Sequence, residues 1–200
     1  QYYCMSLAQR GFAVVNYTYR LAPEYKFPAQ LEDLNLVCKW VMKRAGRFHF
    51  DTERIFAVGD SAGGHLLGLY AGICTNPEKA AGFDLQVPEG FAFTAIALNC
   101  GVYRIPKEAP ESLTMQIMSE LLPEGGTEEE LEKIDVINGI TDVYPPTFCM
   151  TAVADFQKEQ APALVRKLMD CNVPFVYRMF GDKVNQLGHV FHCDIKTIDA

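Results

Sequence analysis

The chain has 200 residues, a formal net charge of −7 and a sequence pI near 5.1. Hydrophobic residues make up 49% and charged residues 22% of it, a composition typical of a folded globular domain rather than a disordered chain or a coiled coil. The acidic balance and the lack of any Lys or Arg cluster argue against nucleic acid as a partner. No apolar stretch approaches the ~20 residues of a membrane-spanning helix.

Seven cysteines are scattered along the chain and never occur in C-x-x-C spacing. This distribution predicts neither a zinc site nor a disulfide framework. The mostly apolar neighbours of the cysteines favour reduced, buried thiols in a cytoplasmic protein. The chain begins with Gln1 and shows neither an initiating Met nor a secretory leader, so a processed or missing N-terminus stays open.

The first half of the chain alternates between helix and strand signals. In chain order, apolar spacing and turn residues predict a helix at 2–10, a strand at 12–17 continuing toward 21, a helix at 31–46, a strand at 55–58 and a helix at 64–73. A loop with two prolines separates the first strand from the second helix.

The second half continues the alternation around one unusual segment. Its expected elements are a surface loop at 76–90, a strand at 93–99, helical fragments at 113–122 and 128–134, a strand at 147–153, a helix at 161–168, a strand at 173–180 and a loop at 181–192. Residues 103–142 are polar and carry no strand signal, so we expect them to form a small helical cap inserted into a single domain that spans 1–200.

This order of elements predicts an α/β fold. Strands that alternate with helices form a mainly parallel sheet with helices on both faces. In such a sheet the C-terminal ends of the strands lie along one rim, where ligands bind. Chemistry-bearing residues that follow strands are therefore the first candidates for a site.

The sequence IFAVGDSAGGHLL at 55–67 combines a strand, a sharp turn and a helix. Its G-x-S-x-G pattern places glycines two positions before and after Ser61, where we expect a larger side chain to collide with the neighbouring strand or helix. Such a turn exposes Ser61 and directs the backbone N–H of Ala62 toward a developing oxyanion. The alternative is that Ser61 only caps the helix.

Asp155 and His189 complete a candidate set with Ser61. Each of the three follows the C-terminal end of a predicted strand, in the order serine, acid, histidine that α/β-hydrolases use. A serine hydroxyl needs an imidazole to take its proton, and the imidazole needs a carboxylate to hold its tautomer. For Asp155 the alternative is a helix-start residue that accepts backbone N–H bonds.

Other acids and histidines occupy less suitable places. Asp142 and Asp182 are the weaker candidates for the acid. His192 is the weaker candidate for the base, because the glycine and apolar residues around His189 suit a loop that turns inward. The remaining histidines are expected to be structural and are His49 and His65.

Several short motifs occur together in a fixed order. They are YRLAPE at 19–24, FPA at 27–29, D-x-x-R-I at 51–55, GDSAGG at 59–64, YPPT at 144–147 and GHVF at 188–191. Over nearly the whole chain these motifs resemble α/β-hydrolase esterases, above all the hormone-sensitive-lipase-like carboxylesterases and acetyl esterases. The segment GGHL at 63–66 is also similar to feruloyl esterase-like and kynurenine formamidase-like relatives.

The resemblance implies an α/β-hydrolase fold and a role for each site residue. Ser61 is then the nucleophile, Asp155 the acid, His189 the base and Ala62 one oxyanion donor. The family also carries an HGGG-type loop shortly before the segment equivalent to Tyr2 and a further helix after the histidine, and this sequence has neither. We therefore expect a fragment trimmed at both ends, without a second oxyanion donor whose loss typically costs about 10²–10³ in kcat.

The expected function is that of a serine hydrolase. It cleaves carboxylic esters with short or medium acyl groups through an acyl-enzyme, with a small-molecule ester as partner and no metal or organic cofactor. One alternative is a serine amidase or formamidase on the same triad, because the first catalytic steps coincide. The other is a catalytically silent hydrolase-fold protein that binds a small molecule or a partner. The oligomeric state stays open.

Overall fold

The computed structural model describes residues 2–106 and 111–194. Within these residues four strands form one sheet, and every neighbouring pair is parallel. The strands follow their order in the chain: β1 (Phe56–Asp60), β2 (Ala95–Asn99), β3 (Thr147–Ala152) and β4 (Phe175–Phe180). The predicted parallel α/β sheet is therefore confirmed, with each crossover made by a helical segment.

The register of the sheet places the strand ends level with one another. Asp60 at the end of β1 pairs with Asn99, and Asn99 pairs with Met150 of β3. On the far side, Ala152 at the end of β3 pairs with Phe180 at the end of β4. Residues that follow these strands consequently start from one rim.

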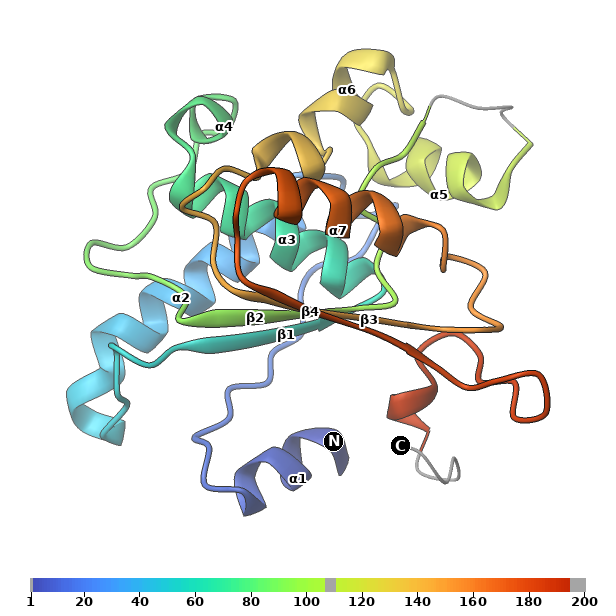
Figure 1. Cartoon of the computed structure of the whole chain (residues 1–200). Coiled ribbons are helices and arrows are strands. Elements are labelled where there is room, and N and C mark those ends of the chain that lie inside the picture. The colour runs from blue at the N-terminus through green and yellow to red at the C-terminus, as the bar shows by residue number, and fades with distance from the viewer. Residues whose placement is uncertain (1, 107–110, 195–200) are drawn as a thin grey trace.

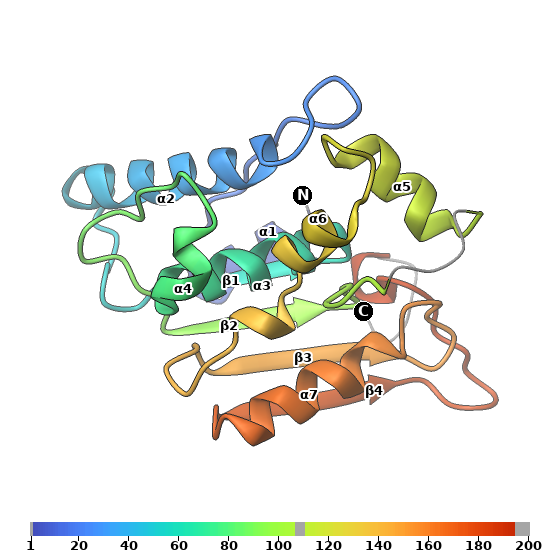
Figure 2. The ribbon, with the colours of Figure 1, turned by 90° about the horizontal axis from the view of Figure 1, so that it is seen from above.

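Helices cover the sheet unevenly (Figure 1). Most of them lie on one face, where α3 and α7 run above the strands, while α1 and the short turn η2 lie on the other face (Figures 1 and 2). The helices are α1 (Tyr2–Gln9), α2 (Ala29–Phe48), α3 (Ala62–Thr75), α4 (Pro77–Ala81), α5 (Leu113–Leu121), α6 (Glu128–Lys133) and α7 (Gln160–Asp170), with 3-10 turns η1 (Ile137–Gly139) and η2 (Phe191–Cys193). None of them, in the part of the chain described, has the length and apolar content to cross a bilayer.

Helix α3 is the centre of the core. Leu69, Tyr70 and Ala71 have no exposed surface, because α3 packs against β1 and β2 on one side and against η1 on another. Two glycines allow α3 to pack closely against η1 and the residues just before it. A Cβ at Gly68 would lie 2.8 Å from the Val136 side chain, and a Cβ at Gly72 would lie 3.3 Å from the backbone of η1. Bulk on this helix would therefore separate it from the segment that follows α6.

The predicted strand at 12–17 is wrong. Residues 12–20 form no strand, although they are rich in β-branched and aromatic side chains. A strand exists only as part of a hydrogen-bonded ladder, and the neighbouring β1 pairs only with β2 among the described residues. The segment instead passes β1 through side-chain contacts such as the edge-on rings of Phe12 and Phe56, 6.0 Å apart.

Two helix boundaries also differ from the expectation. Helix α2 continues through Gly46 to Phe48, and the next residue, His49, takes the left-handed conformation (φ 56°). An internal glycine costs a helix only ~1 kcal/mol. The predicted loop at 76–90 contains α4, whose start is marked by the Asn76 side chain accepting two backbone N–H groups and by Pro77 at the first helical position.

The segment predicted as a cap is helical, with α5 and α6 separated from the sheet (Figures 1 and 2). Its second part is not isolated from the main domain, because Ile134, Val136 and Ile140 are buried in the same core as α3. Residues 103–142 therefore remain a proposed cap insertion, whose described C-terminal part packs into the core of the main domain.

Candidate active site

Ser61 sits on a strained turn between β1 and α3. Its backbone has φ 54° and ψ −118°, a conformation that costs a non-glycine residue about 1–3 kcal/mol. Two backbone hydrogen bonds hold it: the Ser61 N–H donates to the Asn99 carbonyl (2.9 Å), and the Ser61 carbonyl accepts from the His65 N–H (3.1 Å). The Ser61 side chain caps no backbone N–H of α3, so the turn presents the hydroxyl rather than using it as a cap.

The glycines of the motif carry unequal steric demands. A Cβ at Gly59 would lie 2.3 Å from the Gly63 carbonyl oxygen, and a Cβ at Gly64 would lie 3.1 Å from the Gly59 oxygen. A Cβ at Gly63 meets nothing within 4 Å. The expectation that both positions flanking Ser61 must be glycine for lack of space is therefore right for Gly59 and wrong for Gly63.

Ser61, His189 and Asp155 form one hydrogen-bonded chain. The Ser61 Oγ lies 2.9 Å from His189 Nε2, and His189 Nδ1 lies 2.7 Å from Asp155 Oδ1. An ionised carboxylate only accepts hydrogen bonds, so Nδ1 carries a proton and donates it to Asp155. In the neutral imidazole the lone pair of Nε2 then faces the serine hydroxyl.

Asp155 is fixed and ionised within the protein. Only 1% of it is exposed, and its carboxylate also accepts from the Thr151 hydroxyl and the Gln157 N–H, both at 2.9 Å. Burial raises the pKa of Asp155, but hydrogen bonds from the Gln157 N–H and His189 outweigh it and hold the pKa below its ordinary value. The carboxylate is thus charged at neutral pH, as needed to stabilise an imidazolium.

An apolar cavity of about 650 Å³ opens beside Ser61. Ser61 and Ala62 line it together with residues of helix α5, of the segment 19–27 and Phe156. The ring centroid of Phe156 lies 4.5 Å from that of His189. A carbonyl carbon at Ser61 would therefore have an apolar space next to it for one of its substituents.

Ala62 is the first residue of α3 and is exposed at the cavity. N–H groups in the first turn of a helix have no acceptor within that helix, and the partial positive charge of the helix N-terminus favours an anion there. Ala62, the predicted oxyanion donor, thus follows Ser61 in the chain and lines the same cavity.

Asp182, a weaker candidate for the acid, and the histidines His49 and His65, which are expected to be structural, make other contacts than the Ser61–His189–Asp155 chain. The Asp182 carboxylate accepts two backbone N–H groups of its own loop, both at 2.7 Å. His49 follows α2 at the surface. His65 lies 2.9 Å from the Ile134 carbonyl through Nε2, and burial lowers its pKa, so it is a neutral link between α3 and the chain after α6.

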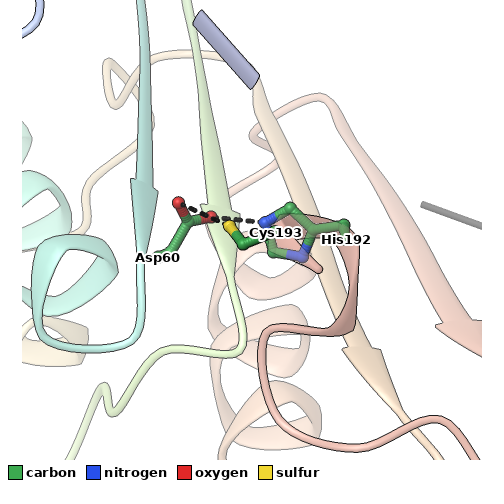
Figure 3. Close-up of side chains that lie close together, drawn as sticks. All are labelled: Asp60, His192 and Cys193. Carbon is green, nitrogen blue, oxygen red and sulfur yellow. Dashed lines mark hydrogen bonds and ion pairs between the residues drawn. The ribbon is translucent and has the colours of Figure 1, made fainter. Parts of the chain in front are cut away.

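One contact was missed by the sequence reasoning. His192 Nε2 lies 2.6 Å from Asp60 Oδ1, and Cys193 Sγ lies 3.7 Å from Asp60 Oδ2 (Figure 3). Asp60 stands within the GDSAGG motif and His192 three residues after His189, but no periodicity links residues so far apart in sequence. Only the fold brings them together.

Donor side chains gather in two places among the described residues. Asp60, His192 and Cys193 form one group, and Cys100, Asp155 and His189 form the other; within each, the donor atoms lie within 4.8 Å of one another. Burial raises the pKa of the Cys100 thiol to about 12, which keeps it protonated and a poor metal ligand. In both groups the carboxylate already hydrogen-bonds the imidazole.

The sequence pattern of the α/β hydrolase fold family matches residues 2–193. The chain belongs to this family. Among curated members, it is 45% identical to arylacetamide deacetylase of Oryctolagus cuniculus over 131 residues, which are 62% of this chain and 32% of that protein. It is 34% identical to the hormone-sensitive lipase of Homo sapiens over 124 residues, which are 60% of this chain and 10% of that protein.

Solved structures of other α/β hydrolases support the same fold. Esterase B from Lactobacillus rhamnosis superimposes with a TM-score of 0.80 at 28% identity, and the match covers 94% of this chain and 61% of that one. The predicted resemblance to hormone-sensitive-lipase-like esterases is thus confirmed. The chain spans less than half the length of the curated relatives it matches.

Proposed function

We propose that this α/β hydrolase cleaves carboxylic esters with Ser61 as nucleophile, His189 as general base and acid, and Asp155 as the residue that orients the imidazole. The observation that carries the proposal is the continuous chain of hydrogen bonds from Ser61 Oγ through His189 to Asp155, at 2.9 and 2.7 Å. The names of its relatives, an esterase and a lipase among them, support the same chemistry.

The geometry accounts for each step. His189 Nε2 accepts the Ser61 proton as Oγ bonds to the ester carbonyl carbon, and the Ala62 N–H stabilises the negative oxygen that forms. The carbon–oxygen bond to the alcohol then breaks, and His189 returns the proton to the leaving oxygen. Water, deprotonated by His189, attacks the acyl-enzyme in the same way and releases the acid and the free Ser61.

The imidazolium is the charged species that needs support in these steps. The ionised Asp155 lies 2.7 Å from His189 Nδ1 and is itself held by Thr151 and Gln157. Because these bonds restrict the carboxylate, they also restrict the ring of His189. The base is thereby kept within reach of Ser61 in the absence of substrate.

The apolar cavity favours a short or medium acyl group. Ile117 of α5 lines it and is 51% exposed, so a larger side chain at 117 can extend into the cavity without disturbing the core. We expect Ile117→Trp to lower kcat/KM for p-nitrophenyl hexanoate about 10-fold while p-nitrophenyl acetate changes less than 2-fold, because a longer acyl chain fills more of the cavity that Ile117 lines.

Ser119→Trp provides the matched control, since residue 119 is exposed on the same helix and does not line the cavity. It should leave both substrates unchanged. Equal losses for the two esters in Ile117→Trp would contradict the assignment of this cavity to the acyl group, and best turnover on long-chain esters would contradict the short or medium preference.

Amide hydrolysis is the second candidate activity. It is supported by the 45% identity to a protein named arylacetamide deacetylase, and the attack of Ser61 on an amide carbonyl would use the same three residues. The two activities are separated by comparing kcat/KM for p-nitrophenyl acetate with that for an acetanilide and for N-formylkynurenine. The larger value identifies the substrate class.

Labelling with a fluorophosphonate probe tests the proposed nucleophile directly. We expect the protein to bind the probe covalently at Ser61, because the probe reacts with serines activated by a base. Ser61→Ala should lose the label, whereas Ser6→Ala, which changes a half-buried serine of α1, should keep it. A folded protein that does not label at all would instead support a silent binding protein with the hydrolase fold.

A further inference from the structure

Asp60 and His192 form a hydrogen-bonded pair that the proposed reaction does not use (Figure 3). His192 Nε2 lies 2.6 Å from Asp60 Oδ1, and the Asn99 side-chain N–H₂ donates to the same oxygen at 2.9 Å. The His192 side chain is 8% exposed and that of Asp60 is 30% exposed. The pair is therefore largely shielded from water, where such a bond is stronger than at the surface.

The pair joins the same two segments as the Ser61–His189 bond. Asp60 directly precedes Ser61 at the end of β1, and His192 follows His189 by three residues. Ser61 Oγ lies 2.9 Å from His189 Nε2, and Asp60, the residue before Ser61, forms its hydrogen bond with His192. These two neighbouring hydrogen bonds, together with the longer contact from Cys193 Sγ to Asp60 Oδ2 (3.7 Å), connect the end of β1 to the chain around η2.

Other contacts also anchor the segment that carries His189. It leaves the sheet at the end of β4, and Val184 at its tip is 96% exposed. Leu187 and Phe191 are buried, and they pack with Met150 and Ala152 in a small cluster. The Ala154 N–H also donates to the Leu187 carbonyl at 3.0 Å, two residues before His189. The Asp60–His192 bond adds a directional contact three residues after His189, which apolar packing at Phe191 does not provide.

The separation of the donor atoms identifies the contact as a hydrogen bond rather than an unoccupied metal site. Two ligands bound to one zinc ion at about 2.0–2.2 Å in a tetrahedral arrangement lie roughly 3.3 Å or more apart. The 2.6 Å between Nε2 and Oδ1 is shorter than that and suits a charge-assisted hydrogen bond. His192 Nδ1 is buried and has no hydrogen-bond partner among residues 2–106 and 111–194, which favours the tautomer with its proton on Nε2.

We infer that the Asp60–His192 pair is a positioning element that holds His189 against Ser61. This inference rests on the proposed function, because it assigns the pair a role in the same reaction. Asp60 and His192 are not among the residues that line the cavity at Ser61, and we place their action in the backbone of their neighbours. Since a misplacement of about 1 Å in a catalytic group can cost 10²-fold in rate, loss of the pair should act on kcat.

His192→Phe and His192→Gln test the role of the hydrogen bond. Phe keeps a ring of similar size but cannot donate, whereas the Gln amide can donate from nearly the position of Nε2. We expect kcat for p-nitrophenyl acetate, divided by the active sites counted with a phosphonate titrant, to fall roughly 10- to 100-fold in His192→Phe with KM within 2-fold of wild type. His192→Gln should recover most of the loss.

Val184→Ser is the control on the same segment, and its kcat should equal that of wild type. A His192→Phe protein that keeps the wild-type kcat per active site would overturn the inference even if its Tm falls, because a merely structural role changes the folded fraction only. Equal losses of kcat in His192→Phe and His192→Gln would also overturn the inference. So would one zinc ion per chain in the purified wild-type protein, if His192→Gln abolishes zinc binding.

The crystal structure of His192→Phe separates this inference from the proposed function. If wild type shows neither turnover nor labelling, the proposed function is wrong, and the distance from His189 Nε2 to Ser61 Oγ in the variant still decides the positioning role. A lengthening well beyond the 2.9 Å of the present structure supports it. An unchanged distance overturns it.

Discussion

Ser61→Ala is expected to lower kcat for p-nitrophenyl acetate by roughly 10⁶-fold, the order of loss found when a triad serine is removed. The reason is that no other described residue offers a hydroxyl within reach of His189 Nε2, which lies 2.9 Å from Ser61 Oγ. Binding should persist, because the apolar cavity is unchanged, so KM should move far less than kcat. Steady-state kinetics on the two purified proteins provide the measurement.

The double variant Ser61→Ala with His189→Ala tests whether the two residues act together. Residues that act as a unit lose their effect together, so the second substitution should add little to the first. If the two losses instead multiply, Ser61 and His189 contribute independently and the hydrogen-bonded chain does not operate as a triad. A kcat in Ser61→Ala within 10-fold of wild type would exclude Ser61 as the nucleophile.

Gly59→Ala is expected to lower the free energy of unfolding by about 3 kcal/mol, at the upper end of the usual cost of overpacking. The added Cβ would stand 2.3 Å from the Gly63 carbonyl oxygen and 2.5 Å from its carbon, which are backbone atoms that no rotamer change can move. The turn at Ser61 must then open. For a chain of this size the loss corresponds to roughly 6–12 °C in Tm, measured by thermal unfolding.

Gly63→Ala is the matched control for the same motif. Its Cβ would meet nothing within 4 Å, and residue 63 lies in the first turn of α3, where alanine is a better helix former than glycine. We expect a Tm equal to or slightly above that of wild type. A Gly63→Ala protein less stable than Gly59→Ala would show that the crowding at this turn is not steric in the way the structure indicates.

Local patterns were sufficient to predict most elements of this protein. The glycine-rich turn at 59–63 marked the junction of β1 and α3, and β-branched or apolar runs marked the other strands. These signals are local because a turn or a helix is stabilised by residues close in sequence. The order Ser61, Asp155, His189 then followed from the rule that ligands gather at the C-terminal rim of a parallel sheet.

Local sequence patterns do not predict whether a segment pairs with a neighbouring strand. The run at 12–17 has the composition of a strand, but whether it pairs depends on what lies beside it, and β1 offers it no ladder in the described residues. The same limit applies to the glycines of the motif. Composition suggested that Gly59 and Gly63 are equally constrained, whereas the direction of each Cα–Cβ bond makes only Gly59 face the opposing backbone.

The sequence by itself determined the parallel α/β architecture, the membership of the hydrolase family and the identity of the three residues of the proposed triad. The tertiary structure alone decided that Asp60 pairs with His192 and that an apolar cavity lies between α5 and the residues around 19–27. The reason is physical: these contacts join residues far apart in the chain, and their distances depend on how helices and loops pack rather than on any repeating pattern.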